Sequence, residues 1–188
     1  MHIWKREGYT KAWHFAAQAH NGQTVPGSEL PYIVHVGNVA MVVMTAIAAS
    51  GEVKDPDLAV KCALLHDVIE DTPVSYAQLF ESFGPEVAAG VAALSKDAEL
   101  DDKSARMADS LTRIQAQPAE VWMVKMADRI TNLQPPPAHW KPERIAAYQK
   151  EAMKIHAALS PANAYLSTQL SEAIESYGAH LGKIEPGR

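Results

Sequence analysis

The sequence predicts an all-α fold, a compact bundle of several helices in a single domain. Apolar residues recur at intervals of three and four along most of the chain, and no useful stretch alternates in the manner of a strand. Helix start and stop signals divide the chain, among them Asp55-Pro56 and Gly84-Pro85. With 188 residues, 47% of them hydrophobic, the chain is long enough to bury a substantial core.

Two helices and a connecting loop are predicted in the first quarter of the chain. Ala12, Trp13 and Ala16 follow helical spacing within residues 9–20, and Asn21-Gly22 is expected to end this helix. A loop rich in glycine, proline and serine follows. Residues 35–50 are apolar on nearly every side, which predicts a helix in the middle of the bundle that ends at Gly51.

The next helices carry recognisable caps. Asp55 precedes a proline at the first helical position, and that helix is expected to run on through His66 and Asp67. Ser75 and Gln78 form a capping-box pattern at the start of a short helix, which Gly84-Pro85 ends before another helix to about Leu94. Further helices are predicted at 103–116, 119–133, 142–158 and 161–177, the last with Ser160 as its cap, Pro161 at its first position and Gly178 ending it.

Charge and composition exclude several classes of protein. Seventeen Lys and Arg against 22 Asp and Glu give a formal net charge of −5 without a basic stripe, so a nucleic-acid partner is not expected. The longest apolar run, 39–49, is shorter than the roughly 18 to 20 residues that span a bilayer, so no membrane helix is predicted. The start of the chain lacks a secretory pattern and Cys62 is the single cysteine, so a cytoplasmic location is expected.

Four ionisable groups follow an apolar run near the middle of the chain. On a continuous helix His66, Asp67, Glu70 and Asp71 lie at about 0°, 100°, 40° and 140°, which places them on one face. Three carboxylates and an imidazole beside core residues repel one another unless a cation lies among them. The pattern therefore indicates a divalent metal, with a solvated polar helix end as the alternative. Gly-rich phosphate loops, nucleophile elbows and zinc-binding cysteine pairs are absent from the sequence.

Two more residues extend this candidate metal site. His35 begins the buried second helix, although a satisfied core or capping histidine is the alternative reading. Asp128 is flanked by residues predicted to be buried, where Arg129 or a helix N-terminus could also satisfy it. Together with His66 and Asp67 they give two nitrogens and two carboxylates, which suit manganese, magnesium, iron or zinc in a catalytic role.

A histidine, then a His-Asp pair, then an aspartate on three helices resembles the HD-domain metal-dependent phosphohydrolases. More specifically, the sequence is similar to the hydrolase domain of RelA/SpoT homologues in the blocks at 19–23, 31–35, 65–72, 83–84 and 124–133. The similarity covers about 9–177. It implies a stand-alone small alarmone hydrolase like the metazoan SpoT homologue, with one domain over 1–188, a core at 9–177 and a short C-terminal tail.

This resemblance implies a reaction and a set of roles. The reaction is removal of the 3′-pyrophosphate from the guanosine alarmone (p)ppGpp, giving GDP or GTP and pyrophosphate, with Mn²⁺ as the usual metal. The implied metal ligands are His35, His66, Asp67 and Asp128. Glu70 and Asp71 match the acidic pair that activates and orients the attacking water, a role that a carboxylate near a polarised phosphate can perform.

Further residues match positions that contact the nucleotide. Asn132 lies one helical turn beyond Asp128, while Arg144 and Tyr148 match an arginine and a tyrosine of the family's pocket, with an ordinary solvent-facing pair as the alternative. Candidates to neutralise the pyrophosphate, against the default of surface side chains, are Lys96, Lys103, Arg106 and Lys125.

The sequence departs from the family pattern at the base pocket. Family hydrolases commonly carry a basic pair after the Gly-Gln, whereas this chain has Thr24-Val25-Pro26. The departure keeps open another small-molecule substrate, such as (p)ppApp or NADPH. A non-catalytic alarmone-binding protein is a third hypothesis, and the intact Glu70-Asp71 pair argues against it.

Overall fold

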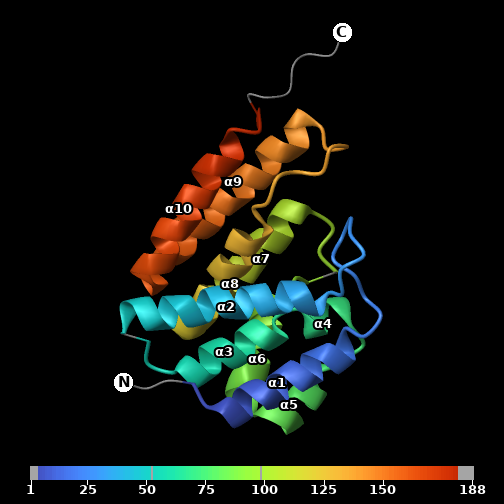
Figure 1. Ribbon diagram of the computed structural model, residues 1–188, viewed down its shortest axis with the longest axis vertical. Helices are drawn as coiled ribbons and strands as arrows, with labels where there is room; N and C mark the ends of the chain where they lie inside the picture. Colours follow the sequence, from blue (N-terminus) through green and yellow to red (C-terminus); the bar gives the residue numbers. More distant parts are fainter. Residues whose placement is uncertain (1–3, 52, 98, 182–188) are drawn as a thin grey trace.

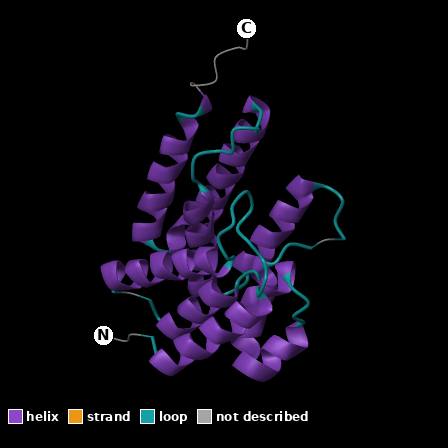
Figure 2. Ribbon diagram, turned by 45° about the vertical axis from the view of Figure 1, so that its right-hand side comes forward, coloured by secondary structure: helices purple, strands orange, loops and turns teal. Residues whose placement is uncertain are grey.

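The computed structural model describes residues 4–51, 53–97 and 99–181, without the side chain of Lys103. Within those ranges the regular elements are helices (Figure 2). One isolated β-bridge joins Thr24 and Pro31. The predicted all-α class is confirmed. The end of the predicted C-terminal tail, 182–188, lies outside the described residues.

The helices follow the predicted order. Their bounds are α1 (Arg6–Ala19), α2 (Ile33–Ser50), α3 (Pro56–Leu65), α4 (Val68–Asp71), α5 (Tyr76–Phe83), α6 (Pro85–Leu94), α7 (Lys103–Gln115), α8 (Ala119–Asn132), α9 (Pro142–Leu159), the 3₁₀ helix η1 (Ser160–Ala162) and α10 (Ala164–Gly178).

Helix α2 crosses the middle of the molecule, with α3 and α8 packed against it (Figure 1). Its Val36, Val39 and Val43 are fully buried. By length and composition alone this 18-residue helix could span a membrane. The apolar run 39–49, on which the sequence-based prediction of no membrane helix depends, covers only part of it. Its packing is that of a core helix, because its buried side contacts other helices of the bundle.

Two glycines allow close helix packing. A Cβ on Gly37 of α2 would lie 3.2 Å from the indole of Trp13 in α1. A Cβ on Gly90 of α6 would lie 2.9 Å from Cys62 Sγ in α3 and 3.0 Å from Val121 Cγ2 in α8. Small residues at these positions therefore set the spacing between the helices of the core.

Most predicted caps are present, and one is wrong. The Asp55 side chain accepts from the backbone N–H of Leu58, and Ser75 with Gln78 forms the complete capping box. Asn163 caps the last helix in place of Ser160 by accepting from the N–H of Leu166. Ser160 and Pro161 belong instead to the short η1 turn, because helix α9 continues up to it.

The helix that was expected to continue through His66 and Asp67 ends at Leu65, so that prediction is wrong. His66 and Asp67 form a turn, and α4 begins at Val68. The buried side chains of Leu65 and Val68 anchor the chain on both sides of this turn. The helical angles predicted for the acidic cluster therefore do not apply beyond Leu65.

Candidate metal centre

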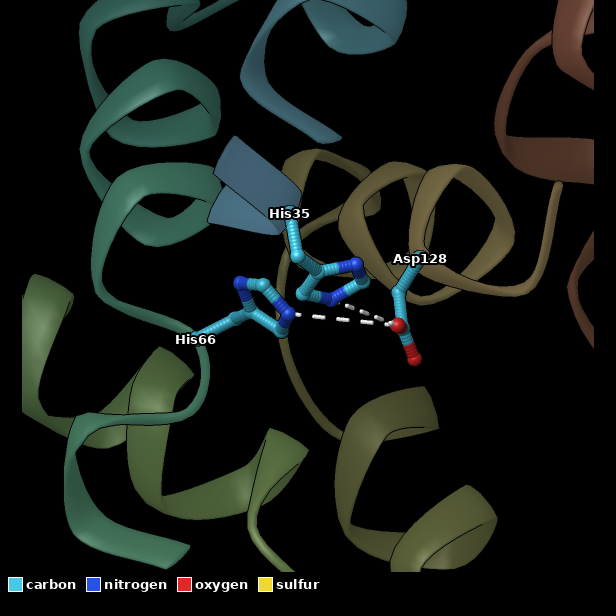
Figure 3. A group of neighbouring side chains, drawn as sticks. All are labelled: His35, His66 and Asp128. Atoms are coloured by element: carbon cyan, nitrogen blue, oxygen red, sulfur yellow. Dashed lines mark ion pairs between the residues drawn. The ribbon is translucent and has the colours of Figure 1, made fainter. Parts of the chain in front are cut away.

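Three elements bring the predicted metal ligands together. His35 lies in the first turn of α2, His66 in the turn after α3, and Asp128 near the end of α8. His35 Nε2 is 3.5 Å from Asp128 Oδ1, and His66 Nε2 is 3.9 Å from the same oxygen (Figure 3). One ligand atom from each residue lies within 4.8 Å of the others, and all three are buried. This geometry fits a cation held between them.

Asp67 lies beside this group as its fourth member. Its Oδ2 is 2.9 Å from His66 Nε2 and 3.7 Å from His35 Nε2. The same oxygen accepts a hydrogen bond of 2.6 Å from the Tyr32 hydroxyl. The four residues predicted from the sequence therefore meet at one place in the structure.

The donor atoms have the chemistry that a divalent cation requires. The Nδ1 of His66 lies 2.8 Å from the Ala63 carbonyl oxygen, which orients the ring and leaves Nε2 for a ligand. That Nε2 is buried, and no partner is aligned with it for a hydrogen bond. Two imidazoles and two carboxylates without a thiolate suit manganese, magnesium, iron or zinc. The residues present therefore fit a divalent metal.

Electrostatics of the cluster also favour a bound cation. Burial lowers the pKa of His66, but the Asp67 carboxylate, with smaller contributions from Asp128 and the Ala63 carbonyl, raises that pKa to about 9. Burial raises the pKa of Asp128, but Lys125 and the two histidines hold it well below its usual range. The carboxylates thus remain charged and attract positive charge, whether a proton or a metal supplies it.

The two residues of the acidic pair have different partners. Glu70 accepts hydrogen bonds from the Nζ and the backbone N–H of Lys96. Asp71 Oδ2 lies 3.3 Å from the Tyr32 hydroxyl. Burial, Asp67 and Glu70 together raise the pKa of Asp71. The pair thus flanks the metal centre, with one member tied to a lysine and the other to a tyrosine.

A cavity of about 630 Å³ opens beside the metal centre. Its walls come from the loop before α2, from the end of α8 and from α9. Its lining includes the predicted residues Asn132, Arg144 and Tyr148, together with His35, Val25 and Pro26. Asn132 also donates a hydrogen bond of 2.6 Å to Asp128 Oδ1, which links the cavity to the metal centre.

The candidate cations for the pyrophosphate lie in different environments. Lys96 is 39% exposed and pairs with Glu70. Lys125 is buried, with its Nζ 3.2 Å from Asp128 Oδ2. Arg106 donates from Nε to the Leu100 carbonyl, and the side chain of Lys103 lies outside the described part of the structure. Of the three described cations, Lys96 combines a partly exposed side chain with a contact to the acidic pair.

Sequence reasoning missed three residues that shape this region. The Tyr32 hydroxyl donates a hydrogen bond to the Asp67 carboxylate. The Arg144 guanidinium lies 4.0 Å from the centre of the Trp140 ring, and the Arg129 guanidinium lies 4.3 Å from the centre of the Tyr148 ring. Tyr32 lies within the family-like block 31–35, which was the available signal. Trp140 follows three prolines in a loop, where no periodicity indicates its direction.

Comparisons with known proteins identify the family of this chain and several similar proteins. The HD domain family matches residues 12–164. A Danio rerio protein named guanosine-3′,5′-bis(diphosphate) 3′-pyrophosphohydrolase MESH1 is 29% identical over 173 residues, which cover 89% of this chain and 93% of that protein. A Myxococcus xanthus GTP pyrophosphokinase is 35% identical over 158 residues, which cover 80% of this chain and 20% of that protein. This chain therefore spans about a fifth of the Myxococcus relative.

A solved structure has a similar fold over nearly the whole chain. It is described as a metazoan ortholog of SpoT that hydrolyzes ppGpp and plays a role in starvation responses. The TM-score is 0.78 at 28% sequence identity, and the similarity covers 94% of this chain and 99% of the other. Because the HD domain family matches residues 12–164, this chain belongs to that family.

Proposed function

We propose that this chain is a Mn²⁺-dependent hydrolase that removes the 3′-pyrophosphate of (p)ppGpp. The observation that carries this proposal is the convergence of His35, His66, Asp67 and Asp128 beside a cavity of about 630 Å³. A cavity of this volume is in the range of small-molecule sites. The names of the Danio rerio relative and of the metazoan structural neighbour support the choice of substrate.

The four ligand residues would hold the metal through their imidazole nitrogens and carboxylate oxygens. When bound, a divalent cation supplies Lewis acidity toward a phosphoryl oxygen. Asn132 donates a hydrogen bond to Oδ1 of Asp128, and Lys125 donates one to Oδ2. These two bonds keep the carboxylate oriented toward the histidines. Manganese is the metal that the family resemblance favours, and the mixed nitrogen and oxygen donors are compatible with it.

The acidic pair would handle the attacking water. The water oxygen would form a bond to phosphorus while Glu70 accepts a proton from this water. Asp71 would orient the water. The bond between this phosphorus and the 3′ oxygen breaks, and the leaving nucleotide takes up a proton as a 3′ hydroxyl. One water is consumed, and the products are GDP or GTP and pyrophosphate.

The cavity would hold the nucleoside. Trp140 and Tyr148 supply aromatic surface, and their rings meet edge to face at 5.5 Å. The Arg144 guanidinium lies over Trp140 and can approach an anionic group of a bound nucleotide. Lys96, beside Glu70, is the candidate to bind the pyrophosphate.

The cavity lining favours one alternative substrate class. Val25 and Pro26 form part of the wall that faces the cavity, and neither offers a charge or a side-chain hydrogen bond to a base. This wall does not distinguish guanine from adenine, so (p)ppApp or another adenine nucleotide such as NADPH is the second candidate. A non-catalytic binder is a weaker candidate, because it has no need of Glu70 and Asp71 beside the metal centre.

We also infer that the chain forms one hydrolase domain over 1–188, with its core at 9–177. We infer that it acts in the cytoplasm on a small nucleotide, without a nucleic-acid partner. The helices share one buried core, which supports a single domain. The formal net charge of −5 supports the absence of a nucleic-acid partner.

A substrate panel tests the proposed function. Mn²⁺-loaded protein is incubated with ppGpp, ppApp, NADPH and deoxynucleotides, and the products are identified by chromatography. We expect GDP and pyrophosphate from ppGpp, and no product from the Asp67→Ala variant. Binding of ppGpp without any product would contradict the hydrolase and support the non-catalytic binder.

A further inference from the structure

The Tyr32 hydroxyl lies between two carboxylates that have separate roles in the proposed function. It donates to Asp67 Oδ2 at 2.6 Å and lies 3.3 Å from Asp71 Oδ2. A phenol carries one proton, which Asp67 and Asp71 therefore share as a bifurcated hydrogen bond, with the short arm to Asp67 and the longer, weaker arm to Asp71. One hydroxyl thus links the metal centre to the acidic pair.

The rest of Tyr32 is fixed independently of this hydroxyl. Its backbone N–H donates to the Gln23 carbonyl at 2.9 Å, and its own carbonyl accepts from the His35 N–H at 2.9 Å. Its ring lies between the rings of His20, at 4.8 Å, and His35, at 5.3 Å. These backbone and ring contacts do not involve the hydroxyl, so they would persist in a variant that lacks it.

A second connection fixes the backbone near Asp71. Gln23 donates from Nε2 to the Asp71 carbonyl at 2.5 Å, and its Oε1 lies 2.7 Å from Nδ1 of His20. The loop that holds Tyr32 thus also holds the end of α4. Because Gln23 binds the backbone of both Tyr32 and Asp71, it constrains the distance between the Tyr32 hydroxyl and the Asp71 carboxylate.

The oxygen that Tyr32 binds is the one that faces the histidines. Asp67 Oδ2 lies 2.9 Å from His66 Nε2 and 3.7 Å from His35 Nε2. Hydrogen-bond donors to ligand carboxylates set their orientation, and their loss typically lowers metal affinity or activity by about 10- to 100-fold. The geometry is therefore that of a residue acting on the metal through Asp67.

We propose that Tyr32 is a positioning residue whose single hydroxyl orients both Asp67 toward the metal and Asp71 toward the attacking water. The part that concerns Asp71 rests on the proposed function. The part that concerns Asp67 does not depend on the identity of the nucleotide.

The Tyr32→Phe variant tests the proposal, because phenylalanine keeps the ring contacts with His20 and His35 and loses only the hydroxyl. Mn²⁺ affinity is measured by titrating metal-free protein in the absence of nucleotide. We expect the dissociation constant to rise by about 10- to 100-fold, and kcat for ppGpp at saturating Mn²⁺ to fall by about 10-fold or more. The KM for ppGpp should change by less than about threefold, because no substrate contact is lost.

Tyr76→Phe is the matched control, since Tyr76 is exposed on α5. It should leave the Mn²⁺ dissociation constant and kcat unchanged. Thermal unfolding of metal-free Tyr32→Phe should stay within about 4 °C of the wild type, as expected for one lost hydrogen bond. A Mn²⁺ dissociation constant for Tyr32→Phe within about twofold of the wild-type value would overturn the role toward Asp67.

A double-mutant cycle tests the role toward Asp71. If the hydroxyl acts partly through this carboxylate, Tyr32→Phe should lower kcat less in an Asp71→Asn background than in the wild type. If Tyr32→Phe lowers kcat by the same factor in the Asp71→Asn background as in the wild type, the role toward Asp71 is overturned. If the chain hydrolyses none of the panel nucleotides, the proposed function fails, while the Mn²⁺ titration still decides whether Tyr32 positions Asp67.

Discussion

Lys96 binds Glu70 through two separate nitrogen atoms. Its Nζ lies 2.7 Å from Oε1, and its backbone N–H donates to Oε2 at 2.9 Å. Both carboxylate oxygens are thus held by one residue from the loop after α6. Because Lys96 is 39% exposed, a phosphate group that enters beside it competes with Glu70 for the ammonium group. We expect this exchange to leave Oε1 open to the attacking water.

Glu70→Gln should separate binding from chemistry. Glutamine keeps the shape and a carbonyl acceptor for Lys96, but it cannot take a proton from water. Turnover should therefore fall by about 10² to 10⁴, while Mn²⁺ and nucleotide binding persist. Product chromatography measures turnover, and calorimetry with ppGpp and Mn²⁺ measures binding.

Glu81→Gln on the exposed side of α5 provides the control for the same chemical change. It should leave turnover at the wild-type rate. Wild-type turnover in Glu70→Gln would exclude Glu70 as the base and would favour Asp71 in that role.

Asp67→Ala should remove the metal from the protein. The variant loses the oxygen that lies 2.9 Å from His66 Nε2 and that Tyr32 holds in place. Elemental analysis after gel filtration should show near-complete loss of bound divalent ion. The exposed Asp101→Ala serves as the control and should retain metal. Full retention of metal with unchanged affinity in Asp67→Ala would refute its assignment as a ligand.

Base selectivity should be weak in the wild-type chain. The wall formed by Val25 and Pro26 offers no cation to stack on guanine. We expect kcat/KM for ppGpp and ppApp to differ by less than about tenfold, which corresponds to about 1.4 kcal/mol. Competition assays with both nucleotides measure this ratio directly.

Val25→Arg should shift the ratio toward guanine, because its side chain lines the cavity. A stacked guanidinium contributes about 1 to 2 kcal/mol when partly desolvated, or roughly a tenfold change. Thr24→Arg adds the same charge one residue earlier and should have the smaller effect. A hundredfold preference for guanine in the wild type would show that another group, such as Tyr148, reads the base.

Gly90→Ala should destabilise the fold, although alanine usually favours a helix by about 1 kcal/mol over glycine. The added Cβ would lie 2.9 Å from Cys62 Sγ and 3.0 Å from Val121 Cγ2, both in the buried core. Overpacking of this kind costs about 1 to 3 kcal/mol. Thermal denaturation should therefore show a lower midpoint.

Two further variants check the cause of this loss. Combining Gly90→Ala with Cys62→Ala removes the sulfur that the new methyl group meets, so part of the lost stability should return relative to Cys62→Ala alone. Gly8→Ala places its Cβ near the flexible end of Lys61, which can move, and should not lower the midpoint. An unchanged midpoint in Gly90→Ala would contradict the prediction, because it would show that overpacking costs no more than the helix preference of alanine contributes.

The sequence by itself determined most of the helices and the residue types of the candidate metal site. Caps and helical spacing act within a few residues, so Asp55 and Ser75 could be assigned their local roles from neighbouring letters. The residue types also identified His35, His66, Asp67 and Asp128 as a set, because uncompensated buried imidazoles and carboxylates are costly. Ser160 and Asn163 are both residue types that cap helices, and local spacing alone does not decide between them. In the structure Asn163 caps the last helix, and Ser160 begins the 3₁₀ helix.

Only the tertiary structure decided how these residues face one another. A helical angle assumes an unbroken helix, but α3 ends at Leu65. Glu70 therefore meets Lys96, 26 residues later in the chain, and Asp67 meets Tyr32, 35 residues earlier. Such contacts depend on how helices pack around a shared core, and no local periodicity encodes them. The sequence thus supplied the reactive groups, and packing decided which of them share a hydrogen bond.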